Sequence, residues 1–388
     1  EKEPLFLDKS LLQSAHTPDE IPHREDQIKQ IANVLAPVLR LERPSNLFIY
    51  GKTGTGKTVC VRHTTQKLEE VAKQNNIELQ VVYVNCKLSK VADTEYRLIA
   101  HLAREFGKEI PYTGLPTGEV YKYFYSAIDS KKCIVLLVLD EIDQLISKTS
   151  DEILYNLTRI NSELVNAQIA IVGISNDLIF ADNMDPRVKS SLSEEELVFP
   201  PYNALQIQDI LKQRARHAFK EGIIEPGLLE KCAAYAAKDH GDARRALELI
   251  RVAGELAERN NEESIPIKYL DMAEDKIEKD RILDIITTQP QQFKATLYAA
   301  LSLSNNKKST IFTGDLYEIY KKICTQTGLR PLTQRRIADI ISEFDMLGII
   351  NANVISKGRY GRTREICLAF PEALELKIKE IIVKDLGL

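Results

Sequence analysis

The sequence lacks a hydrophobic run that could cross a membrane, since no stretch reaches the roughly 18 apolar residues that a spanning helix needs. It also lacks a C-x-x-C pair, and its six cysteines and six histidines are scattered along the chain. We therefore expect reduced, buried thiols in a cytosolic protein, and no disulfide, zinc or histidine-based metal site. No secretory signal is visible, although the sequence begins at Glu1 rather than Met, which leaves targeting open.

Internal repeats and low-complexity segments are absent as well, and 388 residues allow two or three domains. The net charge of −4 is unevenly distributed. Residues 281–388 carry 16 Lys and Arg against 11 Asp and Glu, a net of +5, whereas residues 1–280 carry 36 against 45, a net of −9. This asymmetry predicts that a polyanionic partner is held by the basic C-terminal third. Taken alone, an excess of five charges is also compatible with an ordinary surface.

Short apolar runs alternate with helical patterns up to residue 200, which predicts an α/β domain with a parallel sheet. The runs are Leu47–Tyr50, Val81–Val84, Ile134–Leu139, Ile169–Ile174 and Leu197–Phe199. After Pro200-Pro201 the strand signals stop, and residues 201–280 are predicted to form a second, helical domain. The first domain then comprises residues 1–200.

A third domain is predicted for residues 281–388. Helical patterns cover about 290–303, 313–327 and 333–347, and strand patterns at 349–356 and 364–370 flank a turn rich in Gly and Arg. Three helices followed by a hairpin are typical of a winged helix, which is a variant of the helix-turn-helix.

A phosphate-binding loop follows the first predicted strand. Residues 51–58 fit G-x-x-x-x-G-K-[ST] in full, and a helical pattern comes directly after them. The loop glycines let backbone N–H groups surround a β-phosphate, Lys57 reaches the β- and γ-phosphates, and the Thr58 hydroxyl is a Mg²⁺ ligand. The predicted nucleotide contacts here are Gly51, Thr53, Gly54, Thr55, Gly56, Lys57, Thr58 and Val59.

Polar residues end the third and fourth predicted strands, where α/β sheets bind ligands. Asp140 is predicted to hold Mg²⁺ and Glu141 to orient and polarise the attacking water, which a hydrolase needs and a simple nucleotide switch does not. Asn176 is predicted to position that water near the γ-phosphate. Asp143 is interpreted as a cap of the next helix, with no firmer role. Together these residues predict a Mg²⁺-dependent ATPase that binds ATP and ADP.

Two arginines complete the candidate site. Arg187 lies before the fifth predicted strand, and Arg244 lies in the capped helix start Gly241–Leu247. Taken alone, each is more often a solvated surface charge.

The order of these motifs along the chain resembles that of the AAA+ ATPases. The phosphate-binding loop comes first, then the strand that ends in Asp-Glu, the strand that ends in Asn, and the two arginines. The resemblance covers residues of about 15–280. The resemblance implies that Asn176 is sensor 1, that Arg244 is sensor 2 in a lid domain, and that Arg187 is the candidate arginine finger, acting on a neighbouring subunit's ATP. It also implies that Ile21, Pro22, His23 and Arg24 pack on adenine.

With the C-terminal winged helix, the whole chain resembles the archaeal origin-recognition and helicase-loader proteins, relatives of eukaryotic origin-recognition-complex subunits. The segments that carry this resemblance are Asp19–Glu25, Gly51–Thr58, Gly241–Leu247 and Pro331–Arg336. The resemblance implies a cytoplasmic, nucleoid-associated initiator that binds double-stranded origin DNA. It implies the replicative helicase and other initiator subunits as partners, and a helical insertion within about 87–104 that touches DNA.

The DNA-binding residues are predicted at two places in the third domain. Thr333 is a plausible N-cap, and the first turn after it enters the major groove in helix-turn-helix proteins. The wing tip is rich in cations that suit phosphates or the minor groove, although a solvated basic hairpin has the same composition. The predicted contacts are Thr333, Gln334, Arg335, Arg336, Lys357, Gly358, Arg359, Tyr360, Arg362 and Arg364.

Three other classes of protein fit some of these sequence features. In a signalling ATPase, the winged helix is an intramolecular or protein-interaction module; Arg187, Arg244 and the cationic wing argue against it. A clamp-loader-like ATPase shares the core but not the basic C-terminal domain. A non-enzymatic transcription regulator does not need Glu141.

Overall fold

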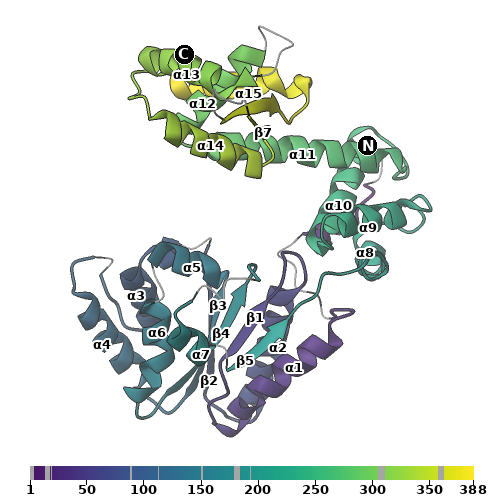
Figure 1. Cartoon of the computed structure of the whole chain (residues 1–388). Helices are drawn as coiled ribbons and strands as arrows, with labels where there is room; N and C mark the ends of the chain where they lie inside the picture. The colour runs from purple at the N-terminus through teal and green to yellow at the C-terminus, as the bar shows by residue number, and fades with distance from the viewer. Residues whose placement is uncertain are drawn as a thin grey trace. The chain divides into compact units, whose positions relative to one another are not determined.

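The computed structural model describes residues 4–13, 18, 20–87, 90–111, 113–149, 152–178, 184–192, 194–304, 311–356 and 362–388. The chain divides into two compact units, Glu1–Leu270 and Asp271–Leu388 (Figure 1). Within the described residues, none of the helices combines the length and the apolar character needed to cross a membrane.

A five-stranded parallel sheet forms the centre of the first unit, as the alternating apolar runs predict. Its strands are β1 (Leu47–Tyr50), β2 (Leu79–Asn85), β3 (Ile134–Asp140), β4 (Gln168–Ser175) and β5 (Glu195–Val198), in the order β2-β3-β4-β1-β5. β3 is buried along its whole length, because it lies inside the sheet and is apolar on both faces. The carboxyl ends of β1, β3 and β4 therefore meet at one edge, next to the phosphate-binding loop.

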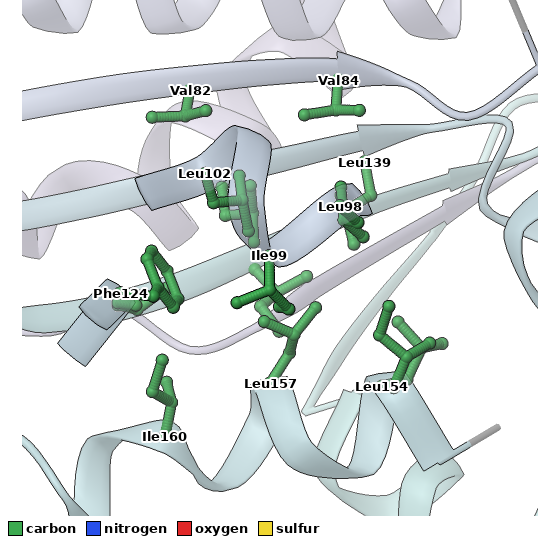
Figure 2. Close-up of a cluster of buried hydrophobic side chains, with 14 of the residues drawn as sticks. Val82, Val84, Leu98, Ile99, Leu102, Phe124, Leu139, Leu154, Leu157 and Ile160 are labelled. Atoms are coloured by element: carbon green, nitrogen blue, oxygen red, sulfur yellow. The ribbon is translucent and has the colours of Figure 1, made fainter. Parts of the chain in front are cut away.

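Helices cover both faces of this sheet, and successive residues of a strand supply opposite faces. The helices of this part are α1 (Glu25–Leu35), α2 (Lys57–Gln74), α3 (Glu95–Glu105), α4 (Thr117–Ile128), α5 (Ile142–Thr149), α6 (Glu152–Arg159) and α7 (Pro186–Leu192). Leu137 and Leu139 belong to the core with α3, α4 and α6, part of which Figure 2 shows, whereas Leu136 and Val138 belong to the core with α1 and α2. The sheet thus fixes the start of α2 against one of its faces.

The helical part that follows contains α8 (Ala204–Ala218), α9 (Leu228–Lys238) and α10 (Ala243–Arg259). α8 begins with a capping box between Asn203 and Gln206, directly after Pro200-Pro201. The first described residues pack against these helices: the ring centroids of Phe6 and Phe219 are 4.6 Å apart. A Cβ at Gly254 would lie 2.6 Å from the Phe6 ring, so only glycine leaves room for that contact. The N-terminal segment thus packs on the lid helices, which its position in the sequence does not reveal.

The second unit combines helices with a small antiparallel sheet. Its elements are α12 (Gln291–Ser304), β6 (Ile311–Phe312), α13 (Thr313–Thr327), α14 (Gln334–Met346), β7 (Ile350–Ser356), β8 (Arg362–Leu368) and α15 (Glu372–Leu386), with strand order β6-β8-β7. The architecture is the predicted winged helix. The two-residue strand β6 was not predicted because it is too short to show a period. α11 (Lys268–Thr288) runs through both the unit boundary and the predicted domain start at 281.

Candidate nucleotide site and nucleic-acid surface

The phosphate-binding loop joins β1 to α2 and requires glycine at two positions. Gly54 and Gly56 have φ values of 73° and 91°, in the left-handed region that favours glycine. Neighbouring groups also exclude a side chain. A Cβ on Gly54 would lie 1.7 Å from Asp242 Oδ1, and one on Gly56 would lie 2.8 Å from Tyr202 Oη. The lid start and the linker before it therefore pack directly on the loop.

Lys57 lies at the centre of this site with only 4% of its surface exposed. Its Nζ donates to the carbonyls of Gly51 at 2.7 Å and Lys52 at 2.8 Å, and to Asn176 Oδ1 at 2.8 Å. Burial lowers the pKa of Lys57 to about 8, with a further contribution from the charge of Arg244. The structure thus brings the predicted lysine and the predicted sensor asparagine together, although 119 residues separate them.

Thr58 and Asp140, the two predicted metal ligands, lie side by side. Thr58 Oγ1 donates to Asp140 Oδ2 at 2.9 Å, and the backbone N–H of Glu141 donates to Asp140 Oδ1 at 3.0 Å. A hydroxyl and a carboxylate next to a phosphate loop suit Mg²⁺, which keeps several waters and takes few protein ligands. The described residues contain no group of three or more His, Cys, Asp or Glu side chains arranged to hold a metal.

Glu141 has a φ of 55°, which is uncommon for a residue with a side chain. Such backbone conformations cluster at functional sites, where the surrounding structure holds them. The Glu141 carboxylate is 3.7 Å from the ammonium of Lys87, the first residue of the predicted insertion. Residues 88 and 89 of that insertion lie outside the described residues, and α3 begins at Glu95.

Asp143 lies inside the first turn of α5 rather than at the predicted cap position, and its carboxylate contacts the end of β4. Its Oδ1 accepts hydrogen bonds from Ser175 Oγ at 3.0 Å and from the backbone N–H of Asn176 at 3.4 Å. Asp143 therefore fixes the end of β4, from which the Asn176 side chain reaches Lys57. The sequence signal for this role was the presence of Asp143 three residues after Asp140. The partners of Asp143 lie at the end of β4, so the sequence did not show what it contacts.

A cavity lies beside the loop, between the segment before α1 and the lid. Its lining includes Gln13, Pro18, Glu20, Ile21, Pro22, Gly54, Gly56, Thr58, Val59, Tyr202, Ile210, Gln213, Arg214, Ala243, Arg244 and Leu247. Of the predicted adenine contacts, Ile21 and Pro22 lie in this lining, and the predicted Val59 and Arg244 lie there too. The apolar side chains provide surfaces on which a planar base can pack.

His23 and Arg24 are placed differently from the other predicted adenine contacts, because neither lines this cavity. His23 Nε2 is 3.1 Å from Asp209 Oδ2 on α8. The buried Arg24 guanidinium donates from Nε to the Thr55 carbonyl at 2.9 Å, and its centre is 3.9 Å from the Tyr202 ring centroid. In the structure, Arg24 thus connects the loop to the linker that leads into the lid.

The two predicted arginines are both exposed and differ in position. Arg244 lies in the first turn of α10, whose N-cap Asp242 accepts from the Arg244 N–H at 2.8 Å. Arg187 lies in α7, outside the cavity lining, and its guanidinium donates to both carboxylate oxygens of Asp185, at 3.1 and 2.9 Å. This pairing lowers the pKa of Asp185 to about 2. Arg244 is therefore near the nucleotide cavity, whereas Arg187 is presented on the surface.

In the second unit, α14 has the predicted features of a recognition helix. Thr333 is its N-cap and accepts from the Arg336 N–H at 3.3 Å, which confirms the predicted cap. Ile337, Ile340, Ile341, Phe344 and Leu347 recur at helical spacing, which predicts an inward face. The first four are buried, and Leu347 is half-buried against the same core. Gln334 and Arg335 are exposed in the first turn, and the exposed Arg336 lies 3.8 Å from both Asp339 and Glu343.

The wing is described only at its base. Lys357, Gly358, Arg359 and Tyr360 lie outside the described residues, and Arg362 begins β8. The side chain of Arg364 is directed to α14, because its Nη1 donates to the Ala338 carbonyl at 2.8 Å and to Ser342 Oγ at 2.5 Å. Arg364 therefore links the base of the wing to α14, a role that no local pattern indicates.

Comparisons with known proteins agree with this geometry. Residues 40–178 match the family described as "AAA domain", residues 208–275 the "Cdc6 AAA+ ATPase-type lid domain", and residues 284–377 the "CDC6, C terminal winged helix domain".

Full-length relatives match as well. The chain is 51% identical to the ORC1-type DNA replication protein of Thermococcus onnurineus, over 98% of this chain and 91% of that protein. It is 50% identical to ORC1-type DNA replication protein 1 of Methanosarcina mazei, over 95% and 88%. The structure of the Aeropyrum pernix ORC1 protein in complex with DNA matches with a TM-score of 0.89 and 42% identity, covering 99% of this chain and 98% of that chain. Given these matches and the sites described above, the chain belongs to the archaeal ORC1-type/Cdc6 family of DNA replication initiators.

Proposed function

We propose that this initiator binds ATP and ADP with Mg²⁺ in the first unit, hydrolyses ATP slowly, and binds double-stranded origin DNA through its winged helix. The observation that carries the proposal is the pair of contacts at the carboxyl ends of parallel strands, where the buried Lys57 and Asp140 are hydrogen-bonded to Asn176 and Thr58. We further propose the predicted division of labour: core 1–200, lid 201–280 and winged helix 281–388.

Each residue of the nucleotide site has a proposed role. Lys57 exchanges its carbonyl partners for phosphate oxygens, and the N–H groups of the glycine-rich loop surround the β-phosphate. Thr58 and Asp140 hold Mg²⁺, which, when bound, neutralises charge on the phosphates. Glu141 orients the attacking water, while Asn176 positions it. Arg244 contacts the γ-phosphate from the lid and so distinguishes ATP from ADP. Arg187 acts on the ATP of a neighbouring initiator subunit.

We infer the DNA partner from the exposed first turn of α14 and from the relative in complex with DNA. Gln334 suits adenine, whereas Arg335 and Arg336 suit guanine or phosphate. Binding there, with cytoplasmic and nucleoid-associated localisation, would let the ATP state control loading of the replicative helicase. The predicted wing contacts at Lys357, Gly358, Arg359, Tyr360 and Arg362, and the insertion near 87–104, belong to the same proposal.

The decisive experiment measures binding of the purified chain to duplex DNA at several salt concentrations. Origin DNA from its own genome is compared with scrambled DNA of the same composition, with ATP, with ADP and without nucleotide. A preference for origin DNA that persists at physiological salt supports the initiator. Weak binding without preference contradicts it and favours the signalling ATPase, whose winged helix is a protein-interaction module.

A further inference from the structure

Tyr83 on β2 contacts the candidate metal site although no motif includes it. The Tyr83 hydroxyl donates a hydrogen bond to Asp140 Oδ2, the same oxygen that accepts from Thr58 Oγ1. Tyr83 is therefore the third donor to this carboxylate, after the Thr58 hydroxyl and the backbone N–H of Glu141.

The position of Tyr83 follows from the alternation of β2. Val82 and Val84 point to the core shared with α3 and α4, so Tyr83 between them points to the opposite face, against the core shared with α1 and α2. α2 begins at Lys57 on that face. Thr58 and Arg62, one helical turn apart on α2, therefore both reach Tyr83 or its partner Asp140.

Arg62 restricts the ring that carries this hydroxyl. Its guanidinium centre lies 4.1 Å from the Tyr83 ring centroid, an attractive cation–π arrangement. The ring is thus held by α2, and its hydroxyl is held by β3. A side chain fixed at both ends is suited to orienting a neighbour.

The need for such an orienting group lies in Asp140 itself. Only 5% of its surface is exposed, so water cannot freely replace a missing hydrogen-bond partner. Groups that hydrogen-bond to a metal ligand fix its orientation, and their loss typically weakens metal affinity about 10- to 100-fold.

We propose that Tyr83 is a positioning residue of the nucleotide site: its hydroxyl holds the Asp140 carboxylate in the orientation that receives Mg²⁺ together with Thr58. This inference rests on the proposed Mg²⁺–nucleotide site. Tyr83 is not part of the cavity lining, and in this proposal it acts through Asp140.

The test compares Tyr83→Phe, which keeps the ring against Arg62, with Tyr121→Phe as matched control. Tyr121, on α4, also donates its hydroxyl to a carboxylate, that of Glu95 on α3, at 2.7 Å. Affinity for fluorescent ADP is measured in EDTA and across a Mg²⁺ titration. We expect Tyr83→Phe to need about 10-fold more Mg²⁺ for half-maximal tightening. Its affinity in EDTA should stay within about twofold of the unmodified chain, and the control should match that chain throughout.

The outcomes separate this inference from the proposed function. No Mg²⁺-dependent tightening in the unmodified chain contradicts the proposed nucleotide site itself. Clear tightening with the same Mg²⁺ midpoint in Tyr83→Phe overturns the role of Tyr83, as does an equal loss of affinity with and without Mg²⁺. If Tyr83→Phe does not fold, Arg62→Ala, which frees the ring, replaces it. We expect that variant to raise the Mg²⁺ midpoint about threefold, and an unchanged midpoint overturns the inference.

Discussion

The nucleotide site and the surface of α14 differ in where their polar groups find partners. In the first unit, Lys57 and Asp140 are almost fully buried, and their hydrogen bonds go to other members of the same site. In the second unit, Gln334 and Arg335 are exposed in the first turn of a helix whose opposite face is buried. In the first region the polar groups are bonded to one another, whereas in the second they face solvent from a helix that is packed on its opposite side.

This difference has an energetic consequence. Removing one member of a buried network leaves the others without partners, so its effects are large and not additive. Exposed cations act on DNA largely through separate phosphate contacts, so their effects are smaller, nearly additive and dependent on salt. Single substitutions in each region distinguish these two behaviours.

Lys57→Ala should have the largest effect. It removes the ammonium proposed to bind phosphate oxygens, and we expect nucleotide affinity to fall at least about 100-fold. DNA affinity without nucleotide should stay within about threefold, because α14 belongs to the other compact unit. Fluorescent-nucleotide titration and DNA-binding isotherms on the same preparation measure both. An equal loss of both affinities would contradict two separable sites.

Glu141→Gln should separate binding from hydrolysis within the same network. The amide keeps the size of the side chain but cannot polarise a water, so we expect single-turnover hydrolysis to slow about 100-fold or more. ATP affinity should change by less than about threefold, since Glu141 is not among the proposed phosphate or metal ligands. Lys87→Ala is the matched control, because it removes the Glu141 ion pair and leaves the carboxylate in place. Hydrolysis that proceeds at the normal rate in Glu141→Gln would contradict the proposed role of Glu141 in activating the water.

The same contrast explains what the sequence could predict. Three features are local patterns in the sequence: the phosphate-binding loop, the polar residues at the ends of two strands, and the helical spacing of apolar residues in α14. Each is found in the structure where it was expected. Tyr83, Asp143 and Arg364 were missed or interpreted otherwise because their partners lie on other elements, and a one-dimensional pattern carries no such pairing. The packing of the N-terminal segment on the lid was missed for the same reason.

Arg335→Ala tests the open surface and should have a moderate effect. We expect DNA affinity to fall about 10-fold at low salt. If Arg335 contacts a phosphate, the slope of log affinity against log salt should become about one unit shallower, and if it reads a base, origin preference should fall instead. Arg281 is an exposed arginine on α11, and Arg281→Ala removes the same charge. We expect this control to leave the DNA affinity and its salt slope close to normal. Identical binding by Arg335→Ala and Arg281→Ala would place this turn of α14 away from DNA.

Arg364→Ala should have the smallest effect on DNA, although Arg364 is predicted from the sequence as a contact. Its guanidinium is hydrogen-bonded to Ala338 and Ser342, so the structure assigns it to the support rather than to the surface. Loss of these half-buried, charge-assisted bonds should destabilise the second unit by about 1–2 kcal/mol, seen as a lower denaturant midpoint. DNA affinity, measured well below that midpoint, should fall by less than about threefold with an unchanged salt slope. A normal midpoint with a shallower salt slope would instead favour Arg364 as the DNA contact that the sequence predicts.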